Sequence, residues 1–238
     1  SGHAARGILL FRYYYDWDQA EAELRRAVEL EPQVAEHRQL LARVLAIRGR
    51  SEEARRESLA AIRLDGLSPG ALSDHAVVLH AAGDVEGSID AYDRALQADP
   101  SFEEAQRGRG VVLLTLGRGD EARDALSRGP RPEGEGGRPG PGPGRDTSPE
   151  GPPDLDDILS TFAERRAEGR GVGGAANFLG PLLAINGDIG GAVELLGEAY
   201  EERTLEPLEL TRALAVPEFA ASAEAQEFLV RIGLREAA

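Results

Sequence analysis

The chain has 238 residues, 41% of them hydrophobic, which is enough for a substantial core in two domains or in one elongated array. Its formal net charge of −15 argues against binding to nucleic acid, because phosphate binding depends on a basic surface. The chain contains no cysteine, which excludes disulfides, thiolate metal ligands and a cysteine nucleophile. It also contains no lysine, which excludes sites that need a lysine amine, such as phosphate-loop nucleotide, protein kinase and pyridoxal sites.

A repeat of 34 residues begins at the start of the chain. Small residues recur near positions 8, 20 and 27 of each unit, large apolar residues near 11 and 24, and a residue that ends a helix at 32. The four units place the following residues there: Ile8, Phe11, Ala20, Leu24, Ala27 and Pro32; Ala42, Leu45, Ala54, Ser58, Ala61 and Gly66; Ala76, Leu79, Ser88, Tyr92, Ala95 and Pro100; Gly110, Leu113, Ala122, Leu126, Gly129 and Gly134. This spacing predicts two helices in each unit.

Packing explains why these residue types recur. Two antiparallel helices approach closely only where side chains are small, and larger residues at helical spacing fill the space between neighbouring units. Gly49, Gly83 and Gly117 fall in one column, where a left-handed backbone is expected to end the first helix of a unit. Pro32 and Pro100 are expected to stop the second helix.

The periodicity stops after the fourth unit. Residues 129–153 are dominated by glycine, proline and charge, and such a composition buries too little apolar surface to offset its ordering entropy. The sequence therefore predicts four repeats over residues 1–128, a disordered linker over 129–153 and a C-terminal helical block over 154–238.

Helical patterning resumes after the linker. Asp154 is a plausible N-cap for a helix over 155–168 that has no partner helix before it. A fifth unit follows, carried by Leu179, Gly180, Leu183, Gly187, Ala192, Leu196 and Ala199. A final helix over 223–232 is expected to cover the open end of the array with Phe228, Leu229 and Ile232, because a terminal repeat otherwise exposes its stacking face.

These columns resemble the tetratricopeptide repeat, and the resemblance covers nearly all of the chain outside the linker. It implies an all-α, right-handed superhelical solenoid of about five antiparallel helix pairs with a C-terminal capping helix. A narrower resemblance is to the C-terminal tetratricopeptide domains of bacterial multidomain regulators, which follow winged-helix, TolB-like, adenylate cyclase or serine/threonine kinase modules. It rests on residues 14–18, Ala199–Arg203, Val216–Phe219 and Phe228–Leu234.

The family resemblance implies that the first helix of each unit lines a concave groove. The residues at the groove positions are Arg6, Leu9, Arg12, Tyr13, Gln39, Leu40, Arg43, Ile47, Val77, His80, Arg107, Val111, Leu114, Asn177 and Phe178, with Glu36, Asp74 and Glu104 among the groove acids. Since arginine binds carboxylates bidentately, the expected partner is a protein or peptide with acidic and aliphatic side chains. The alternative is a solvated helix face with local arginine–glutamate pairs.

Several motifs are more simply explained by structure than by chemistry. The glycine-rich string at 169–174 follows a helix, not the strand that a dinucleotide site requires. His75 and His80 are five residues apart and do not share a helix face, and the acids at 154–157 suit the first turn of a helix. Trp17 and the neighbouring tyrosines are expected in the core. No catalytic, cofactor or metal site is predicted.

The expected function is a protein–protein interaction scaffold or sensory module in bacterial regulation, without enzymatic activity. One alternative is a regulatory segment that acts on an upstream domain of a larger enzyme or transcription regulator. Another is a structural self-assembly factor that forms a homodimer. No apolar run approaches the ~20 residues of a membrane span, so the expected location is the cytoplasm, or the periplasm if a membrane span precedes the chain in the full-length protein.

Overall fold

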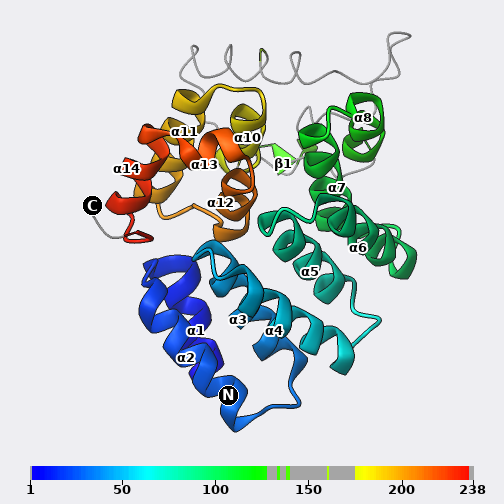
Figure 1. The fold of residues 1–238 in the computed structure, drawn as a ribbon, viewed down its shortest axis with the longest axis vertical. Coiled ribbons are helices and arrows are strands. Elements are labelled where there is room, and N and C mark those ends of the chain that lie inside the picture. The colour runs from blue at the N-terminus through cyan, green and yellow to red at the C-terminus, as the bar shows by residue number, and fades with distance from the viewer. Residues whose placement is uncertain (1, 128–132, 135–137, 140–159, 161–174, 236–238) are drawn as a thin grey trace.

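The computed structural model describes residues 2–127, 133–134, 138–139, 160 and 175–235, and these form stacked helix pairs (Figure 1). The first block, residues 2–127, contains α1 (Gly2–Leu9), the π-helix η1 (Leu10–Tyr14), α2 (Trp17–Leu30), α3 (Ala35–Ile47), α4 (Ser51–Leu64), α5 (Pro69–Ala81), α6 (Val85–Ala98), α7 (Glu103–Thr115) and α8 (Gly119–Ser127). The second block, residues 175–235, contains α10 (Ala175–Ile185), α11 (Ile189–Glu201), α12 (Pro207–Leu214), α13 (Pro217–Ala221) and α14 (Ala223–Arg231). The all-helical solenoid predicted from the repeats is confirmed.

Most of the predicted linker and the predicted helix over 155–168 lie outside the described residues, as does the glycine-rich string at 169–174. Within the linker, β1 (Glu133–Gly134) pairs antiparallel with β2 (Arg138–Pro139), which the sequence analysis did not anticipate. In the part of the chain that the structure describes, no helix has the length and apolar character of a membrane span.

The predicted small residues form the contacts between the two helices of a unit. Ala20, Ala54, Ala76 and Ala122 are fully buried. Gly49, Gly83 and Gly117 have φ angles of 73°, 83° and 68°, the left-handed conformation expected in the turn between the helices. The repeat columns therefore have the structural roles that their residue types predicted.

Aspartates cap the second helices of several units. The side chain of Asp16 accepts a hydrogen bond from the backbone N of Gln19 at the start of α2. Asp84 and Asp188 make the same contact at the starts of α6 and α11. Each of these carboxylates satisfies a backbone donor that has no partner within its helix, and so fixes the position of the turn.

The first unit departs from the expected register by one residue. Ile8, expected at the close crossing of the two helices, is only partly buried, whereas Gly7 is buried. A Cβ atom on Gly7 would lie 2.7 Å from Cγ of Leu24. The π-helix η1 accounts for the shift, because its wider turn takes one more residue than an α-helical turn.

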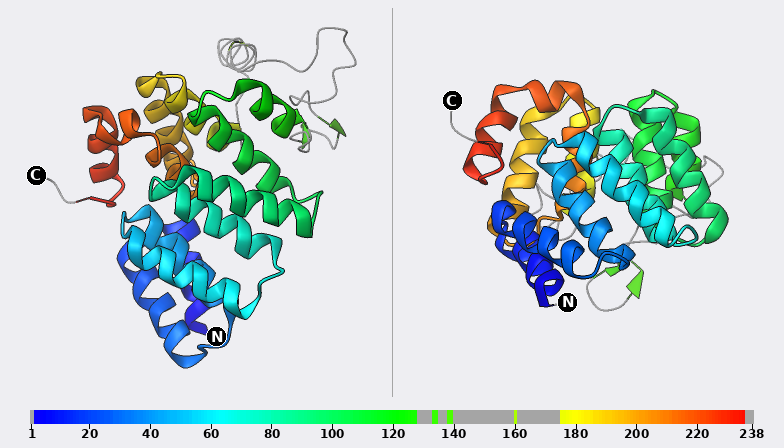
Figure 2. Two further views of the ribbon diagram at one scale, coloured as in Figure 1. Left: turned by 45° about the vertical axis from the view of Figure 1, so that its right-hand side comes forward. Right: turned by 60° about the horizontal axis from the view of Figure 1, so that its bottom comes forward.

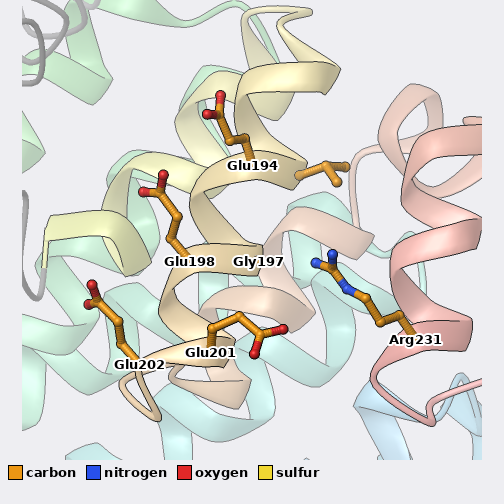
Figure 3. A pocket seen from close by; sticks show the side chains of 7 residues that line it. Glu194, Gly197, Glu198, Glu201, Glu202 and Arg231 are labelled. Atoms are coloured by element: carbon orange, nitrogen blue, oxygen red, sulfur yellow. The ribbon is translucent and has the colours of Figure 1, made fainter.

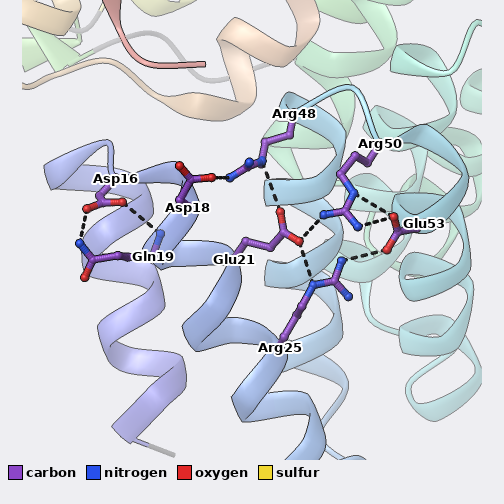
Figure 4. Close-up of polar contacts among 8 residues, drawn as sticks. All are labelled: Asp16, Asp18, Gln19, Glu21, Arg25, Arg48, Arg50 and Glu53. Atoms are coloured by element: carbon purple, nitrogen blue, oxygen red, sulfur yellow. Dashed lines mark hydrogen bonds and ion pairs between the residues drawn. The ribbon is translucent and has the colours of Figure 1, made fainter. Parts of the chain in front are cut away.

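An ionic network joins the first two units, as Figure 4 shows. Glu21 of α2, which is 7% exposed, accepts a hydrogen bond of 2.8 Å from Arg25 and is paired with Arg48 and Arg50. Arg25 also reaches Glu53 of α4 at 2.8 Å. These pairs lie at the edge of the helix stack and hold α2 against α3 and α4.

The second block continues the repeat and then departs from it. Leu179, Ala192, Leu196 and Ala199 are buried, so the fifth unit of α10 and α11 is confirmed. The final helix is confirmed as α14, whose Phe228 and Leu229 are buried together with Ile232. Between them lie α12 and α13, which the sequence analysis did not identify. Both begin with proline, a residue favoured in the first turn of a helix.

The second block is folded back against the first block, and the views in Figure 2 agree on this arrangement. Trp17 of α2 donates a hydrogen bond of 2.8 Å from Nε1 to the carbonyl oxygen of Ile232. The hydroxyl of Tyr15 donates to the carbonyl oxygen of Leu205 at 3.1 Å. One hydrophobic cluster includes residues of both blocks, so the two blocks share a core. The final helix α14 therefore packs on α11 and α13, as expected of a cap, and the turn after it also reaches the first repeat through Trp17.

Candidate protein-binding groove

Helix α12 lies in the groove that the sequence assigned to a partner. It packs against α3 and α5, the first helices of the second and third units, and also against α10. Leu210 and Ala213 of α12 are fully buried. On the groove side, Ile47, Val77 and Val111 are 4%, 3% and 0% exposed. These three residues, predicted to line the groove, are therefore buried in the folded chain, and α12 contacts the helices α3 and α5 that carry two of them.

Charged side chains meet where α12 contacts the groove. Arg212 of α12 is 1% exposed, forms an ion pair with Glu209 one turn earlier, and lies 3.5 Å from the hydroxyl of Tyr92 on α6. Glu209 is also 3.7 Å from Nε of Arg107 on α7. Since burial of a charge is costly unless it is paired, the contact between α12 and the groove depends on these pairs.

The groove also has an ion pair of its own. Arg43 of α3 donates a hydrogen bond of 2.7 Å from Nε to Asp74 of α5. Burial raises the pKa of Asp74 to about 6, against the opposing effect of Arg43, and the nearby carboxylate of Glu104 raises it further. With Glu209 and Arg212, the cluster contains three acids and three arginines, so its charges balance.

Hydrogen bonding in this cluster is incomplete among the residues that the structure describes. Five buried atoms have no hydrogen-bond partner there: Oδ2 of Asp74, Oε1 of Glu104, Nε of Arg107, Oε2 of Glu209 and Nε of Arg212. Unsatisfied polar atoms weaken an interface, because each has lost its bonds to water without replacement. The contact between α12 and the groove is therefore well packed in its apolar part, whereas several buried polar atoms in the described structure have no hydrogen-bond partner.

The predicted groove residues of the first unit lie outside the cluster. Arg12 pairs with Glu206, just before α12, at 2.6 Å, while Arg6 pairs with Glu23 of α2 at 3.2 Å. Leu9 and Tyr13 are 49% and 54% exposed. Of the four, Arg12 contacts the second block through its side chain, and Tyr13 does so through its carbonyl oxygen, which accepts a hydrogen bond of 3.5 Å from Nη1 of Arg203.

Four of the remaining predicted groove residues are described by the structure, and the other two have side chains outside it. Leu40 and Leu114 are partly buried against the shared core, and Gln39 is partly buried on α3. His80 is 3% exposed, and burial lowers its pKa to about 4, with a further contribution from Arg212. The side chains of Asn177 and Phe178 lie outside the described part of the structure.

Sequence reasoning missed the residues that α12 contributes. Glu209, Leu210 and Arg212 were not assigned to the groove, since the repeat pattern does not extend to them. One signal was present, because the two charges lie one turn apart in a leucine-rich segment that starts with a proline. Charged residues within such a segment are expected to be paired if they are buried.

The aromatic residues near the first turn are divided between core and surface. Trp17 and Tyr15 are buried and stacked, with ring centroids 5.7 Å apart, which confirms the expected core role for both. Tyr200 of α11 packs against Tyr15 at 5.0 Å. Tyr13 and Tyr14 are exposed, contrary to the expectation of core packing. His75 is buried between helices, as expected, and its Nδ1 is 2.8 Å from the hydroxyl of Ser58.

A surface pocket of about 390 Å³ lies on α11, away from the groove (Figure 3). Glu194, Glu198, Glu201 and Glu202 line it along one helix, and Arg231 of α14 faces them. The acidic side chains follow helical spacing, which is usual for a solvated helix face. This pocket shares no residue with the groove.

Stacked antiparallel helix pairs with a recurring glycine turn and small residues at each crossing define a helical repeat protein. A sequence profile described as Tetratricopeptide repeat matches residues 12–71 and 73–135, together more than half of the chain. The chain therefore belongs to the tetratricopeptide repeat family.

Two solved structures that are similar to this chain have low sequence identity to it. A thermophilic tetratricopeptide repeat protein from Thermus thermophilus is 17% identical, with a TM-score of 0.52 over 91% of this chain and 98% of that chain. PilF of Pseudomonas aeruginosa is 16% identical, with a TM-score of 0.48 over 98% of this chain and 90% of that chain. A comparison with curated protein sequences finds no match.

Proposed function

We propose that this chain is a protein-binding scaffold whose concave groove, formed by α3, α5 and α7, binds a helical segment of a partner. Tetratricopeptide repeats generally mediate protein–protein interactions, and the chain belongs to that family. The observation that carries the proposal is that the groove already holds a helix, α12, through buried apolar and charged contacts. A surface that binds one amphipathic helix has the shape required for another.

The arginines support a partner with acidic and aliphatic side chains. Arg12 and Arg107 lie beside carboxylates of the second block, Glu206 at 2.6 Å and Glu209 at 3.7 Å. Leu210, next to Glu209 in α12, is fully buried in the core that the two blocks share. The chain thus uses its own groove arginines in the way proposed for a partner, since guanidinium groups pair well with carboxylates.

We further propose that the scaffold acts in bacterial regulation, next to an upstream domain. The motifs behind the resemblance to regulator-linked tetratricopeptide domains are used in the closure of the two blocks. Tyr200 packs on Tyr15, and Phe219 is fully buried. This role involves no catalysis by the chain itself. Self-association through the ends of the array is the alternative, and light scattering over a hundredfold concentration range distinguishes them, because only self-association gives a mass that rises with concentration.

Photo-crosslinking tests the groove directly. A benzophenone amino acid replaces Leu40 or Leu114 in the groove, and in a matched control it replaces Leu67, which is 83% exposed in the loop between α4 and α5. With lysate of the source organism, a partner is expected to crosslink at Leu40 and Leu114 and not at Leu67. If partners crosslink only at Leu67, and the groove positions crosslink only to the second block of the same chain, the groove proposal is wrong.

Simple charge reversal is a weaker test. Reversing Arg12, Arg43 and Arg107 to glutamate would remove pairs with Glu206, Asp74 and Glu209. Such a variant would lose internal contacts together with any partner contacts, so a loss of binding would have two explanations. Crosslinking at apolar groove positions leaves these ion pairs in place.

A further inference from the structure

We propose that α12 competes with a partner for the groove. The partner is a helix that carries a glutamate and, three residues later, an arginine. Its binding displaces α12 together with the second block. This inference rests on the proposed function. It adds the chemistry of the partner and the step by which the groove becomes accessible.

Two groove residues of opposite charge, Arg107 and Glu104, face the occupant of the groove with incomplete hydrogen bonding in the described structure. Arg43 and Asp74 are hydrogen-bonded to each other across α3 and α5. Arg107 and Glu104, both on α7, have buried atoms without hydrogen-bond partners among the described residues. An occupant that fits must therefore bring a carboxylate to Arg107 and a guanidinium near Glu104 and Asp74.

Helix α12 supplies both groups with helical spacing. Glu209 approaches Arg107 at 3.7 Å, and Arg212 follows one turn later beside Tyr92. Residues three apart share a helix face, so the two charges point into the groove together. Leu210 and Ala213 fill the apolar part of the same contact. A competing helix thus needs the order acid, aliphatic, then arginine.

The fit of α12 is imperfect, which leaves room for competition. Oε2 of Glu209 and Nε of Arg212 have no hydrogen-bond partners in the described structure, although both side chains are almost fully buried. A buried ion pair with unsatisfied atoms adds little to stability, but removal of one member is strongly destabilising, so such a pair favours the correct occupant over others. A partner that satisfies these atoms would bind in preference to α12.

Displacement of α12 involves the whole second block. Helix α12 packs on α10 as well as on α3 and α5. The block is also tied to the first unit by the bonds from Trp17 to Ile232 and from Tyr15 to Leu205. Weakening any of these ties is expected to expose the groove without altering the groove residues themselves.

A peptide titration on the full chain tests the inference. The probe is a fluorescently labelled peptide with the sequence of residues 204–216, and the matched control peptide has the same composition with the residues at 209 and 212 exchanged. The protein variants are Glu209→Gln with Arg212→Gln, which weakens the internal occupant, and Glu224→Gln on the exposed face of α14 as the control. Fluorescence anisotropy gives the dissociation constants.

The peptide is expected to bind the double variant at least tenfold more tightly than the Glu224→Gln control, and the exchanged peptide to bind at least tenfold more weakly. A second variant, Trp17→Phe, loosens the second block without touching α12, and it is also expected to strengthen peptide binding. Circular dichroism checks that each variant remains helical. Equal binding of both peptides, or no binding to either loosened variant, overturns the inference.

The crosslinking experiment tests the proposed function separately from the peptide titration. If crosslinking finds a partner at Leu40 and Leu114 while the peptide order makes no difference, the groove binds partners and only the inferred chemistry is wrong. If crosslinking finds none there, the groove proposal itself fails, whatever the peptide does.

Discussion

The indole Nε1 of Trp17 donates a hydrogen bond of 2.8 Å to the carbonyl oxygen of Ile232, 215 residues later in the chain. Figure 1 shows the corresponding segments, the start of α2 and the turn after α14, side by side. This bond joins the first repeat to the last helix. It converts a stack of helix pairs into an array that closes on itself.

Replacement of Trp17 by phenylalanine is expected to weaken the closure. The substitution keeps an aromatic ring next to Tyr15 but leaves the buried carbonyl oxygen of Ile232 without its donor. An unsatisfied buried acceptor costs about 1–3 kcal/mol, so the free energy of unfolding in urea should fall by that amount. Tyr13→Phe, at an exposed ring, is the control and should change it by less than about 0.5 kcal/mol.

Two glycines of the fifth unit should respond to alanine in opposite directions. A Cβ on Gly180 would lie 2.7 Å from Cγ of the buried Leu196, so Gly180→Ala is expected to destabilise the protein by about 1–3 kcal/mol. Gly190 in α11 has nothing within 4 Å, so Gly190→Ala should stabilise it by about 0.5–1 kcal/mol. Thermal unfolding followed by circular dichroism measures both. Equal effects would contradict the close approach of α10 and α11.

Glu21 is expected to matter more than a glutamate in an exposed pair. Removal of its carboxylate in Glu21→Ala leaves Arg25, Arg48 and Arg50 without their shared partner (Figure 4). Since Glu21 is 7% exposed, we expect a loss of about 1–3 kcal/mol in the free energy of unfolding. Glu29→Ala in α2 removes the exposed pair with Arg26 and should cost at most about 0.5 kcal/mol. Chemical denaturation of the two variants provides the comparison.

Two buried histidines predict acid sensitivity. Burial lowers the pKa of His75 and of His80 from 6.5 to about 4. A histidine with a depressed pKa contributes stability that is present above pH 6.5 and is lost as the pH falls through 4. The loss in the free energy of unfolding is about 3 kcal/mol for each histidine. Stability measured by urea titration should therefore fall between pH 7 and pH 4.

The protonation of Asp74 changes the stability of the protein in the opposite direction. Its pKa is raised from 3.8 to about 6, so its contribution to stability is fully present below pH 3.8 and is lost as the pH rises through 6. It therefore offsets about 3 kcal/mol of the loss caused by the histidines when the pH falls. In Asp74→Asn this offset is gone, and the decrease in stability from pH 7 to pH 4 should be larger than in the wild type. A smaller decrease would show that Asp74 is ionised at pH 4.

The repeat architecture was predictable from the sequence because the contacts within a unit are local. A small residue at a helix crossing and a glycine in the next turn constrain each other over a few residues, as Ala76 and Gly83 do. The same reasoning located α10, α11 and α14, where the spacing recurs. It missed the one-residue shift at Gly7, since a π-helix leaves no periodic signal over a single turn.

The candidate site was predictable only in part. Arg43, Val77, His80, Arg107 and Val111 were assigned to the groove by their positions in the repeat. The occupant α12 was not, because its contacts with α3 and α5 join residues far apart in sequence that no repeat relates. Short helices that start with proline give weak periodic patterns, and their partners are set by the tertiary fold.

The closure between Trp17 and Ile232 also has a mechanical meaning. An open array of repeats behaves as a spring, because its pitch is the sum of small rotations between neighbouring repeats. Here the first repeat is joined to the turn after the last helix, so the pitch of the repeats between them cannot change freely. A force that pulls the chain ends apart would load this hydrogen bond and the Arg12–Glu206 pair before it stretched any repeat.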